Sequence, residues 1–259
     1  MPEPTYEDYV RDESFISDYL AYQARWSTNA RESDRVIIEH VANAVEALPS
    51  AGREPHVVDI GCSTGNLLKH LRSALPDVRL SGSDYSPESV ATCRADPALA
   101  GMAFETVDIV QMAAEDVFDV AVVNAVLYLL DQTDFDAALR GLARSLRPGG
   151  TLVVFDFFHP FRQDLSIIER SRSHPDGLPI HFRSMAEVEA SLGVAGFSSV
   201  RFEPFEIPID LEEGAPHGDN RSGFEDLNSY TVRAEDGRRL LFRGTLFQPW
   251  CHLIAVKAA

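Results

Sequence analysis

The chain has 259 residues, of which 45% are hydrophobic and 24% are charged, and its formal net charge is −17. This length suffices for one large α/β domain or two small domains, and the composition is typical of a folded globular protein. The negative charge repels phosphate backbones and anionic lipids, so neither nucleic acid nor a membrane is expected as a partner.

The cysteines Cys62, Cys93 and Cys251 are scattered along the sequence. They form no CxxC pair and no metal-ligand spacing, so we expect neither a disulfide framework nor a zinc site. The sequence contains no apolar stretch of the length that crosses a bilayer. Its first residues are acidic, unlike a secretory signal, and we therefore expect a cytoplasmic protein.

Residues 5–48 show the spacing of apolar residues that is typical of helices, which predicts an N-terminal helical cap over residues 1–50. The cap carries four aromatic residues at steps of four, four and three, namely Phe15, Tyr19, Tyr22 and Trp26. Two interpretations stay open for them. They form the packing face of an amphipathic helix, or they form an aromatic lid over a ligand.

From residue 55 onward, strand-like and helix-like segments alternate. Strands are expected at 56–60, 78–84, 102–108, 118–124, 151–158, 198–207 and 251–258, and helices at 66–75, 87–95, 134–146 and 185–196. This alternation predicts βαβ units and a doubly wound, mainly parallel sheet. We expect a single domain over residues 1–259, with its core formed by 55–205 and 251–259.

Two segments interrupt the alternation, one at residues 158–184 and the other at residues 206–250. The second contains the sequence EDGR between two alternating stretches, which predicts a β-hairpin over residues 229–244. If the last two strands of the core are antiparallel, the second segment starts and ends at the carboxyl edge of the sheet. We therefore expect both insertions to form a lid over a substrate site.

Polar residues follow four successive strands of the predicted sheet: Asp59, Asp84, Asp108 and Asn124. In an open α/β sheet, ligands bind at the carboxyl ends of the strands. Gly61 and Gly65, just after Asp59, permit a tight turn and a close approach of a ligand to the backbone. Asp84 is placed to accept hydrogen bonds from two ribose hydroxyls, and Asp108 from an adenine amino group.

Each of these residues alone is weak evidence, because an aspartate at a strand end is often only a helix cap. A nicotinamide dinucleotide site is the main alternative. It requires G-x-G-x-x-G, whereas here Ser63 replaces the middle glycine and no further glycine follows at the required spacing. A pyrophosphate beside Asp59 is unfavourable, but a ligand with a positive amine and no phosphate is not.

The ordered set of motifs resembles the class I S-adenosylmethionine-dependent methyltransferases. The matching stretches cover about residues 55–158 and read VVDIGCSTGNLL, LSGSDYSPESV, FETVDI, FDVAVVNAVLYLL and ARSLRPGGTLVVFD. The stretches GFSSVRF and WCHLIAVKA look like the last two strands of that family. The resemblance implies a Rossmann-like sheet of seven strands with an antiparallel last strand. Ser63 departs from the usual glycine-rich turn, and its small size is expected to be tolerated.

The resemblance also implies S-adenosylmethionine as the cofactor and a set of residues that bind it. They are Arg31, Asp59, Gly61, Cys62, Ser63, Gly65, Asp84, Tyr85, Ser86, Asp108, Ile109 and Asn124. Asp59 and the glycine turn would meet the methionine end, Asp84 the ribose, and Asp108 the adenine. Arg31 would bind the cofactor carboxylate, unless it is only a solvated helix charge.

Methyl transfer requires mainly that the acceptor be aligned with the sulfonium methyl group and that water be excluded. An alcohol acceptor also requires a base. His159 follows the fifth predicted strand directly and is either this base, a substrate contact or a structural residue. Tyr128 is expected beside the sulfonium as a second catalytic candidate. His174 and His181 are weaker candidates, and no metal site is expected.

Six further residues are expected to contact the substrate: Tyr22, Trp26, Phe161, Arg162, Gln248 and Trp250. An aromatic, enclosed site suits a small-molecule acceptor. We expect oxygen as the methylated atom, ahead of nitrogen or carbon, in natural-product tailoring by a monomer or homodimer. Two alternatives remain, a non-methylating S-adenosylmethionine-binding regulator and an NAD-dependent oxidoreductase.

Overall fold

The computed structural model describes residues 22–49, 52–170, 174, 176–211, 229–243 and 246–259. Residues 1–21 and 50 of the predicted N-terminal cap, with Phe15 and Tyr19, lie outside the described residues. Residues 212–228 of the second insertion also lie outside them.

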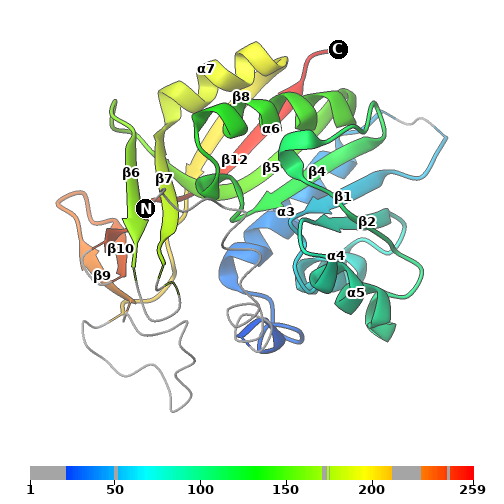
Figure 1. Ribbon diagram of the computed structural model, residues 1–259, viewed down its shortest axis with the longest axis horizontal. Helices are drawn as coiled ribbons and strands as arrows, with labels where there is room; N and C mark the ends of the chain where they lie inside the picture. The colour runs from blue at the N-terminus through cyan, green and yellow to red at the C-terminus, as the bar shows by residue number, and fades with distance from the viewer. Residues whose placement is uncertain (1–21, 50–51, 171–173, 175, 212–228, 244–245) are drawn as a thin grey trace.

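A mixed sheet forms the centre of the molecule (Figure 1). In the described part of the chain it has nine strands, and its main path runs in the order β3–β2–β1–β4–β5–β12–β8. The path consists of β1 (His56–Ile60), β2 (Arg79–Asp84), β3 (Ala103–Thr106), β4 (Phe118–Asn124), β5 (Leu146–His159), β8 (Phe197–Pro204) and β12 (Trp250–Lys257). Strands β1 to β5 pair in parallel, and β12 is antiparallel to both β5 and β8. The predicted doubly wound sheet with an antiparallel last strand is therefore confirmed.

Helices cover both faces of this sheet (Figure 1). One face carries α3 (Glu32–Glu46), α4 (Asn66–Ala74) and α5 (Pro87–Ala95), and the other carries α6 (Gln132–Ser145) and α7 (Met185–Ala195). Neighbouring strand residues point to opposite faces, so Val57 packs with the first group of helices and Val58 with the second. Because both faces are buried, the inner strands are nearly continuous apolar runs, which made them recognisable in the sequence.

Helices α5, α6 and α7 begin where a short polar side chain accepts a backbone hydrogen bond. Ser86 accepts from the amide of Ser89 at the start of α5, and Asp131 accepts from Asp134 at the start of α6. In the described part of the chain, three short 3-10 helices lie in the loops: η1 (Pro97–Leu99), η2 (Ile109–Gln111) and η3 (Leu127–Leu129). Two of them, η2 and η3, follow strands at the carboxyl edge and shape the site.

Both insertions form β-structure. In the first, β6 (Leu165–Glu169) pairs with β7 (Leu178–Ser184), and β7 also continues the sheet beside the end of β5. The sequence analysis did not predict these two strands. In the second, β9 (Ser229–Arg233), β10 (Arg239–Arg243) and β11 (Leu246–Phe247) form a separate antiparallel sheet. The β9–β10 pair confirms the predicted hairpin.

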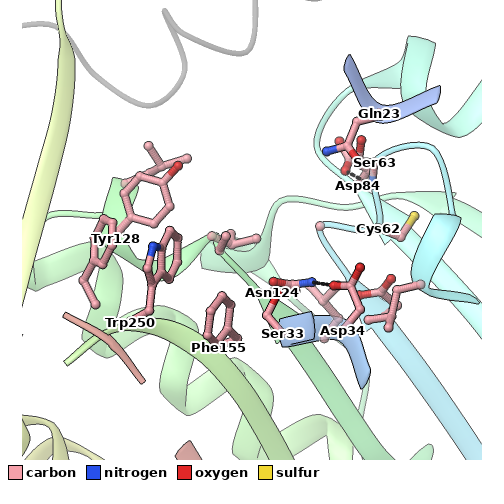
Figure 2. A pocket seen from close by; sticks show the side chains of 18 of the residues that line it. Gln23, Ser33, Asp34, Cys62, Ser63, Asp84, Asn124, Tyr128, Phe155 and Trp250 are labelled. Atoms are coloured by element: carbon pink, nitrogen blue, oxygen red, sulfur yellow. Dashed lines mark hydrogen bonds between the residues drawn. The ribbon is translucent and has the colours of Figure 1, made fainter. Parts of the chain in front are cut away.

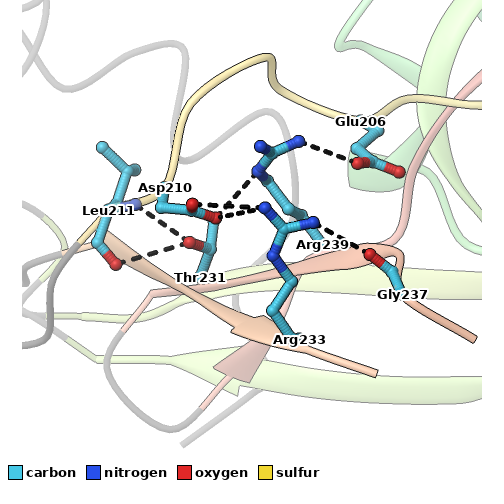
Figure 3. Close-up of polar contacts among 7 residues, drawn as sticks. All are labelled: Glu206, Asp210, Leu211, Thr231, Arg233, Gly237 and Arg239. Carbon is cyan, nitrogen blue, oxygen red and sulfur yellow. Dashed lines mark hydrogen bonds and ion pairs between the residues drawn. The ribbon is translucent and has the colours of Figure 1, made fainter. Parts of the chain in front are cut away.

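Surface ion pairs join this small sheet to the chain that follows β8 (Figure 3). The guanidinium of Arg239 donates to Asp210 over 2.8 Å and to Glu206 over 3.0 Å. The backbone amide of Leu211 donates to the hydroxyl of Thr231 over 2.9 Å. Exposed ion pairs contribute little stability individually, so their main effect is to fix where the small sheet lies.

The second insertion leaves and rejoins the core at one edge of the sheet. Trp250, the first residue of β12, is opposite Phe157 of β5, and Cys251 is opposite Pro204 at the end of β8. This is the edge at which the parallel strands end. Within the described ranges, no helix combines the length and the apolar character needed to cross a bilayer.

Candidate active site

A cavity of about 560 Å³ lies at the carboxyl ends of β1, β2, β4 and β5, where the strand order reverses between β1 and β4. Such switch points are the usual ligand sites of open α/β sheets, and the volume is that of a small-molecule site. One end of the cavity is polar and acidic, and the other end is aromatic (Figure 2).

The glycine turn after β1 forms part of the polar end. The amides of Gly61 and Cys62 both donate to the carbonyl of Ser83, over 2.7 and 2.9 Å. The φ angles of Gly61 and Gly65 are +80° and +71°, in the left-handed region that favours glycine. A Cβ atom on Gly61 would collide with the side chain of Val126. Both the backbone angle and the space therefore require glycine at position 61.

Ser63 departs from the glycine-rich pattern, and the structure shows how the turn accommodates it. Its φ of 49° is a left-handed value that non-glycine residues adopt at some cost. Its amide donates to the Oδ2 atom of Asp84 over 2.8 Å, and the amide of Ser86 donates to Oδ1 over 2.9 Å. Asp84 therefore links the glycine turn to the start of α5. Burial raises the pKa of Asp84, although these two bonds oppose the rise.

Asp59 is a deeply buried carboxylate of the site. It is 2% exposed, and its Oδ1 atom has no hydrogen-bond partner among the described residues. Burial raises its pKa from 3.8 to about 8, and the nearby charges of Asp34 and Asp84 add to the rise. A cationic group in the cavity would offset both the burial and the crowding of negative charge.

Asp34 is a site residue that the sequence analysis missed. It lies in the first turn of α3, is 2% exposed and accepts hydrogen bonds from the side chain of Asn124 over 3.2 Å and from the amide of Arg31 over 3.3 Å. The signal was present, because Asp34 is three and seven residues before Ile37 and Val41, the fully buried residues of the helix. An acid on the apolar face of a helix points to a buried polar site.

Arg31 is held against the cavity by two aromatic rings. Its guanidinium lies 5.4 Å from the ring centre of Tyr22 and 5.2 Å from that of Trp26, and it donates to the side chain of Gln23 over 2.9 Å. The Nε atom is buried and has no partner in the described part of the chain. These contacts do not match a solvated helix charge. The prediction that Arg31 binds a cofactor carboxylate remains open.

Asp108 already has local partners. Its carboxylate accepts from the amide of Val110 over 2.9 Å and from the side chain of Gln111 over 2.8 Å, and so caps η2. It lines the cavity together with Ile109. Its contact with adenine stays a prediction.

Two buried charged residues fix the η3 turn that carries Tyr128. Asp156 accepts from the amides of Leu127 and Tyr128, over 2.8 and 3.2 Å. From the other side, Arg183 of β7 donates to the carbonyls of Leu127 and Leu130. Burial raises the pKa of Asp156 to about 6, against the opposing effects of its hydrogen bonds and of Arg183. The first insertion is thus fastened directly to the turn beside the cavity.

Trp250 is at the centre of the aromatic end (Figure 2). Its ring stacks on Phe155 at a centroid distance of 4.7 Å and an angle of 8°, and it contacts Phe157 at 4.1 Å. Tyr128 meets it edge-on at 6.3 Å. Tyr128 belongs to the η3 turn after β4, Phe155 and Phe157 belong to β5, and Trp250 belongs to β12. The aromatic wall therefore forms only when three segments that are distant in sequence come together.

The structure brings most of the predicted site residues to this cavity. Its walls include Tyr22, Arg31, Asp59, Gly61, Cys62, Ser63, Asp84, Tyr85, Ser86, Asp108, Ile109, Asn124, Tyr128, Gln248 and Trp250. Lining residues that were not predicted include Gln23, Ser33, Asp34, Phe155, Phe157, Glu169 and Phe205. The individual roles of all these residues remain predictions.

Five predicted residues do not line the cavity: Gly65, Trp26, His159, Phe161 and Arg162. His159 is 5% exposed, because β5 continues through it and pairs there with Ser184 of β7 instead of ending at the rim. Phe161 is 64% exposed. The geometry therefore gives no support to His159 as the base.

The other two histidine candidates of the first insertion, His174 and His181, lie in different environments. His174 lines the cavity, whereas the ring of His181 bonds to the hydroxyl of Ser166 over 2.7 Å. Burial lowers the pKa of His181. Within the part of the chain that the structure describes, no three His, Cys, Asp or Glu side chains are grouped so as to hold a metal ion.

Comparison with known proteins supports the resemblance noted in the sequence. A family model described as a methyltransferase domain matches residues 57–150. Over 131 residues, the chain is 35% identical to trans-aconitate 2-methyltransferase of Methylobacterium nodulans, a match that covers 51% of this chain and 47% of that protein. It is 36% identical over 121 residues to ribosomal RNA small subunit methyltransferase C of Klebsiella pneumoniae, covering 43% and 35% of the two chains.

The chain thus spans half or less of the length of these relatives. The names of these relatives differ in the acceptor. Among solved structures, the chain is similar to the Burkholderia thailandensis 1,6-didemethyltoxoflavin-N1-methyltransferase, with a TM-score of 0.56, 16% identity, and coverage of 100% of this chain and 93% of that one. This likeness extends the shared fold beyond the matched segment. The methyltransferase domain matched over residues 57–150 and the strand order both agree with the resemblance to the class I S-adenosylmethionine-dependent methyltransferases.

Proposed function

We propose that the protein transfers the methyl group of S-adenosylmethionine to a small-molecule acceptor. The observation that carries this proposal is the buried, unpaired carboxylate of Asp59 at the polar end of the cavity. An α-ammonium group, such as that of the methionine moiety, supplies the charge and the hydrogen-bond donors that this carboxylate lacks among the described residues.

The same observation disfavours an NAD-dependent oxidoreductase. Asp34, Asp59 and Asp84 surround the glycine turn, and their mutual repulsion contributes to the raised pKa of Asp59. A pyrophosphate would add negative charge at this point, whereas the methionine moiety adds a positive group. A non-methylating regulator is compatible with the polar end alone. It does not account for the second, aromatic end of the cavity.

The residues of the polar end fit the parts of the cofactor in order. Asp59 would hold the ammonium group, Arg31 the carboxylate, Asp84 the ribose, and Asp108 with Ile109 the adenine. Once bound, the cofactor supplies an electrophilic methyl group on a positively charged sulfur. The protein must then orient the acceptor and exclude water, which Tyr128 and the aromatic wall are placed to do.

The acceptor is inferred to be small because the cavity holds about 560 Å³, part of which the cofactor would fill. The net charge of −17 disfavours RNA despite the ribosomal RNA methyltransferase among the relatives. Oxygen is the preferred nucleophile, then nitrogen or carbon, and a role in natural-product tailoring in the cytoplasm fits such an acceptor.

The direct test is to incubate the protein with S-adenosylmethionine and a panel of small molecules that offer a hydroxyl group, an amine or an acidic C–H group. Mass spectrometry would follow the formation of S-adenosylhomocysteine and of the methylated product. Formation of both, and their loss in Asp59→Asn, would support the proposal. Binding of S-adenosylhomocysteine without any methylated product would favour the regulator. In a parallel incubation with NAD and the same panel, reduction of the nicotinamide would favour the oxidoreductase.

A further inference from the structure

The acceptor end of the cavity contains a carboxylate that none of the predicted roles uses. Glu169 is the last residue of β6, lines the cavity and pairs with Leu178 of β7. Its Oε1 atom is buried and has no hydrogen-bond partner among the described residues. A buried oxygen of a carboxylate without a donor is costly, so a native site of this kind usually serves a ligand or the chemistry.

The surroundings of Glu169 place it at the acceptor end. Leu178 and Ile180 of β7 also line the cavity, and they belong to a buried cluster against which Tyr128 and Trp250 pack. The hairpin that carries Glu169 is therefore in contact with the aromatic wall. The acidic residues Asp34, Asp59 and Asp84 line the opposite, polar end.

Other polar side chains reach the cavity from the two insertions, namely His174, Ser229, Arg243 and Gln248. Of these, His174, Ser229 and Arg243 each have interactions of their own. Arg243 brings a positive charge to the cavity, so a negative acceptor must be considered. Glu169 would repel a negatively charged methyl acceptor. Its unsatisfied oxygen requires a hydrogen-bond donor and not another hydrogen-bond acceptor.

Resting on the proposed function, we propose that the acceptor is a planar aromatic compound with a neutral hydroxyl group, and that Glu169 receives the hydrogen bond and then the proton of that hydroxyl. Trp250 and Tyr128 hold the aromatic body. Glu169 thereby takes the role that the sequence analysis considered for His159.

The proton and electrons of this step balance. The O–H bond of the acceptor breaks, and its proton moves to the carboxylate of Glu169. The oxygen forms a bond to the methyl carbon as the carbon–sulfur bond breaks, which leaves a neutral methyl ether and neutral S-adenosylhomocysteine. The proton then passes from Glu169 to water.

Binding of two matched probes tests the acceptor class without relying on activity. Isothermal titration of the full chain, saturated with S-adenosylhomocysteine, would compare 1-naphthol with 1-naphthoate, which have the same ring and differ in the polar group. We expect the wild-type protein to favour naphthol by roughly tenfold or more, because one lost charge-assisted hydrogen bond costs about that factor. In Glu169→Gln the preference should shrink several-fold or disappear.

The matched control is Glu189→Gln, which removes an exposed carboxylate on α7 and should keep the wild-type preference. The same preference in Glu169→Gln as in the wild type, a preference for naphthoate, or no binding of naphthol would overturn the proposal. If S-adenosylhomocysteine itself does not bind, the proposed function fails instead, and the two failures are thus distinguishable.

Catalysis gives the second test, with a hydroxyl acceptor that the protein methylates. Glu169→Gln should lower kcat by roughly 10²- to 10⁴-fold, the usual contribution of a general base, and leave the KM for S-adenosylmethionine unchanged. Glu169→Asp should recover part of the rate. His159→Gln should retain near wild-type kcat, and a larger loss in His159→Gln than in Glu169→Gln would contradict the assignment.

Discussion

At the scale of single residues, Gly61 shows how a local constraint is tied to the site. Its replacement by alanine combines left-handed backbone strain with a collision against Val126. We expect Gly61→Ala to lower the free energy of unfolding by about 2–5 kcal/mol. Gly101→Ala is the control, because its φ of +86° is similar but its Cβ would meet open space, and it should cost about 1–2 kcal/mol. Equal losses in urea titrations of the two variants would show that the contact with Val126 does not matter.

Asp59 should make the stability of the ligand-free protein depend on pH. Because its pKa is about 8 in the folded protein and 3.8 ordinarily, the folded state keeps a proton that the unfolded chain has released. Stability therefore falls as the pH rises from about 4 through 8, by about 2 kcal/mol between pH 6 and pH 8 from this residue alone. Urea titrations at the two pH values should show a smaller decrease for Asp59→Asn than for the wild type. Parallel decreases would refute the assignment of a protonated Asp59.

The same carboxylate should couple ligand binding to proton release. Below pH 8, Asp59 is largely protonated and must ionise to pair with an ammonium group. We expect the affinity for S-adenosylhomocysteine to rise between pH 6 and pH 8, with release of a proton. Titration calorimetry in two buffers of different ionisation enthalpy would measure this release. It should be absent in Asp59→Asn, and an equal release in that variant would assign the proton to another group.

At the scale of elements, Arg183 fastens the β6–β7 hairpin to η3. It is 3% exposed and donates to two backbone carbonyls of that turn. Lysine keeps the charge but cannot reach both carbonyls in one planar geometry. Arg183→Lys should therefore lower the free energy of unfolding by about 1–3 kcal/mol and reduce kcat more than the affinity for S-adenosylhomocysteine. The control Arg140→Lys, at an exposed position on α6, should change neither the free energy of unfolding nor kcat. If Arg183→Lys changes neither quantity, Arg183 does not fasten the hairpin to η3.

The elements also show what the sequence could and could not predict. The inner strands and the α4–α7 helices were recognisable because burial on both faces or on one face leaves a clear periodicity. The β6–β7 hairpin was not, and in the fold Ile180 and Phe182 of β7 join Phe157 in a buried cluster against which Trp250 packs. Glu169 was missed because its importance depends on neighbours that are distant in sequence, whereas Asp34 was missed although its place on the apolar face of α3 was readable in the sequence.

At the scale of the whole molecule, the cavity combines residues of the matched methyltransferase domain with segments that the family model does not cover. Residues 57–150 supply most of the polar end, whereas α3, the two insertions and β12 supply Asp34, Glu169 and Trp250. The sequence motifs could therefore predict the cofactor more firmly than the acceptor. Acceptor choice depends on side chains that only the folded chain brings together.

The most direct test of the central claim is thermal unfolding of the full chain with saturating S-adenosylhomocysteine, and in parallel with NAD. A ligand at about 100 times its dissociation constant adds about 2.7 kcal/mol of stability, which for a chain of this size raises Tm by about 5–10 °C. We expect this rise in Tm with S-adenosylhomocysteine, a much smaller rise with the same ligand in Asp59→Asn, and no rise with NAD. A rise with NAD alone, or no rise with S-adenosylhomocysteine, would contradict the central claim.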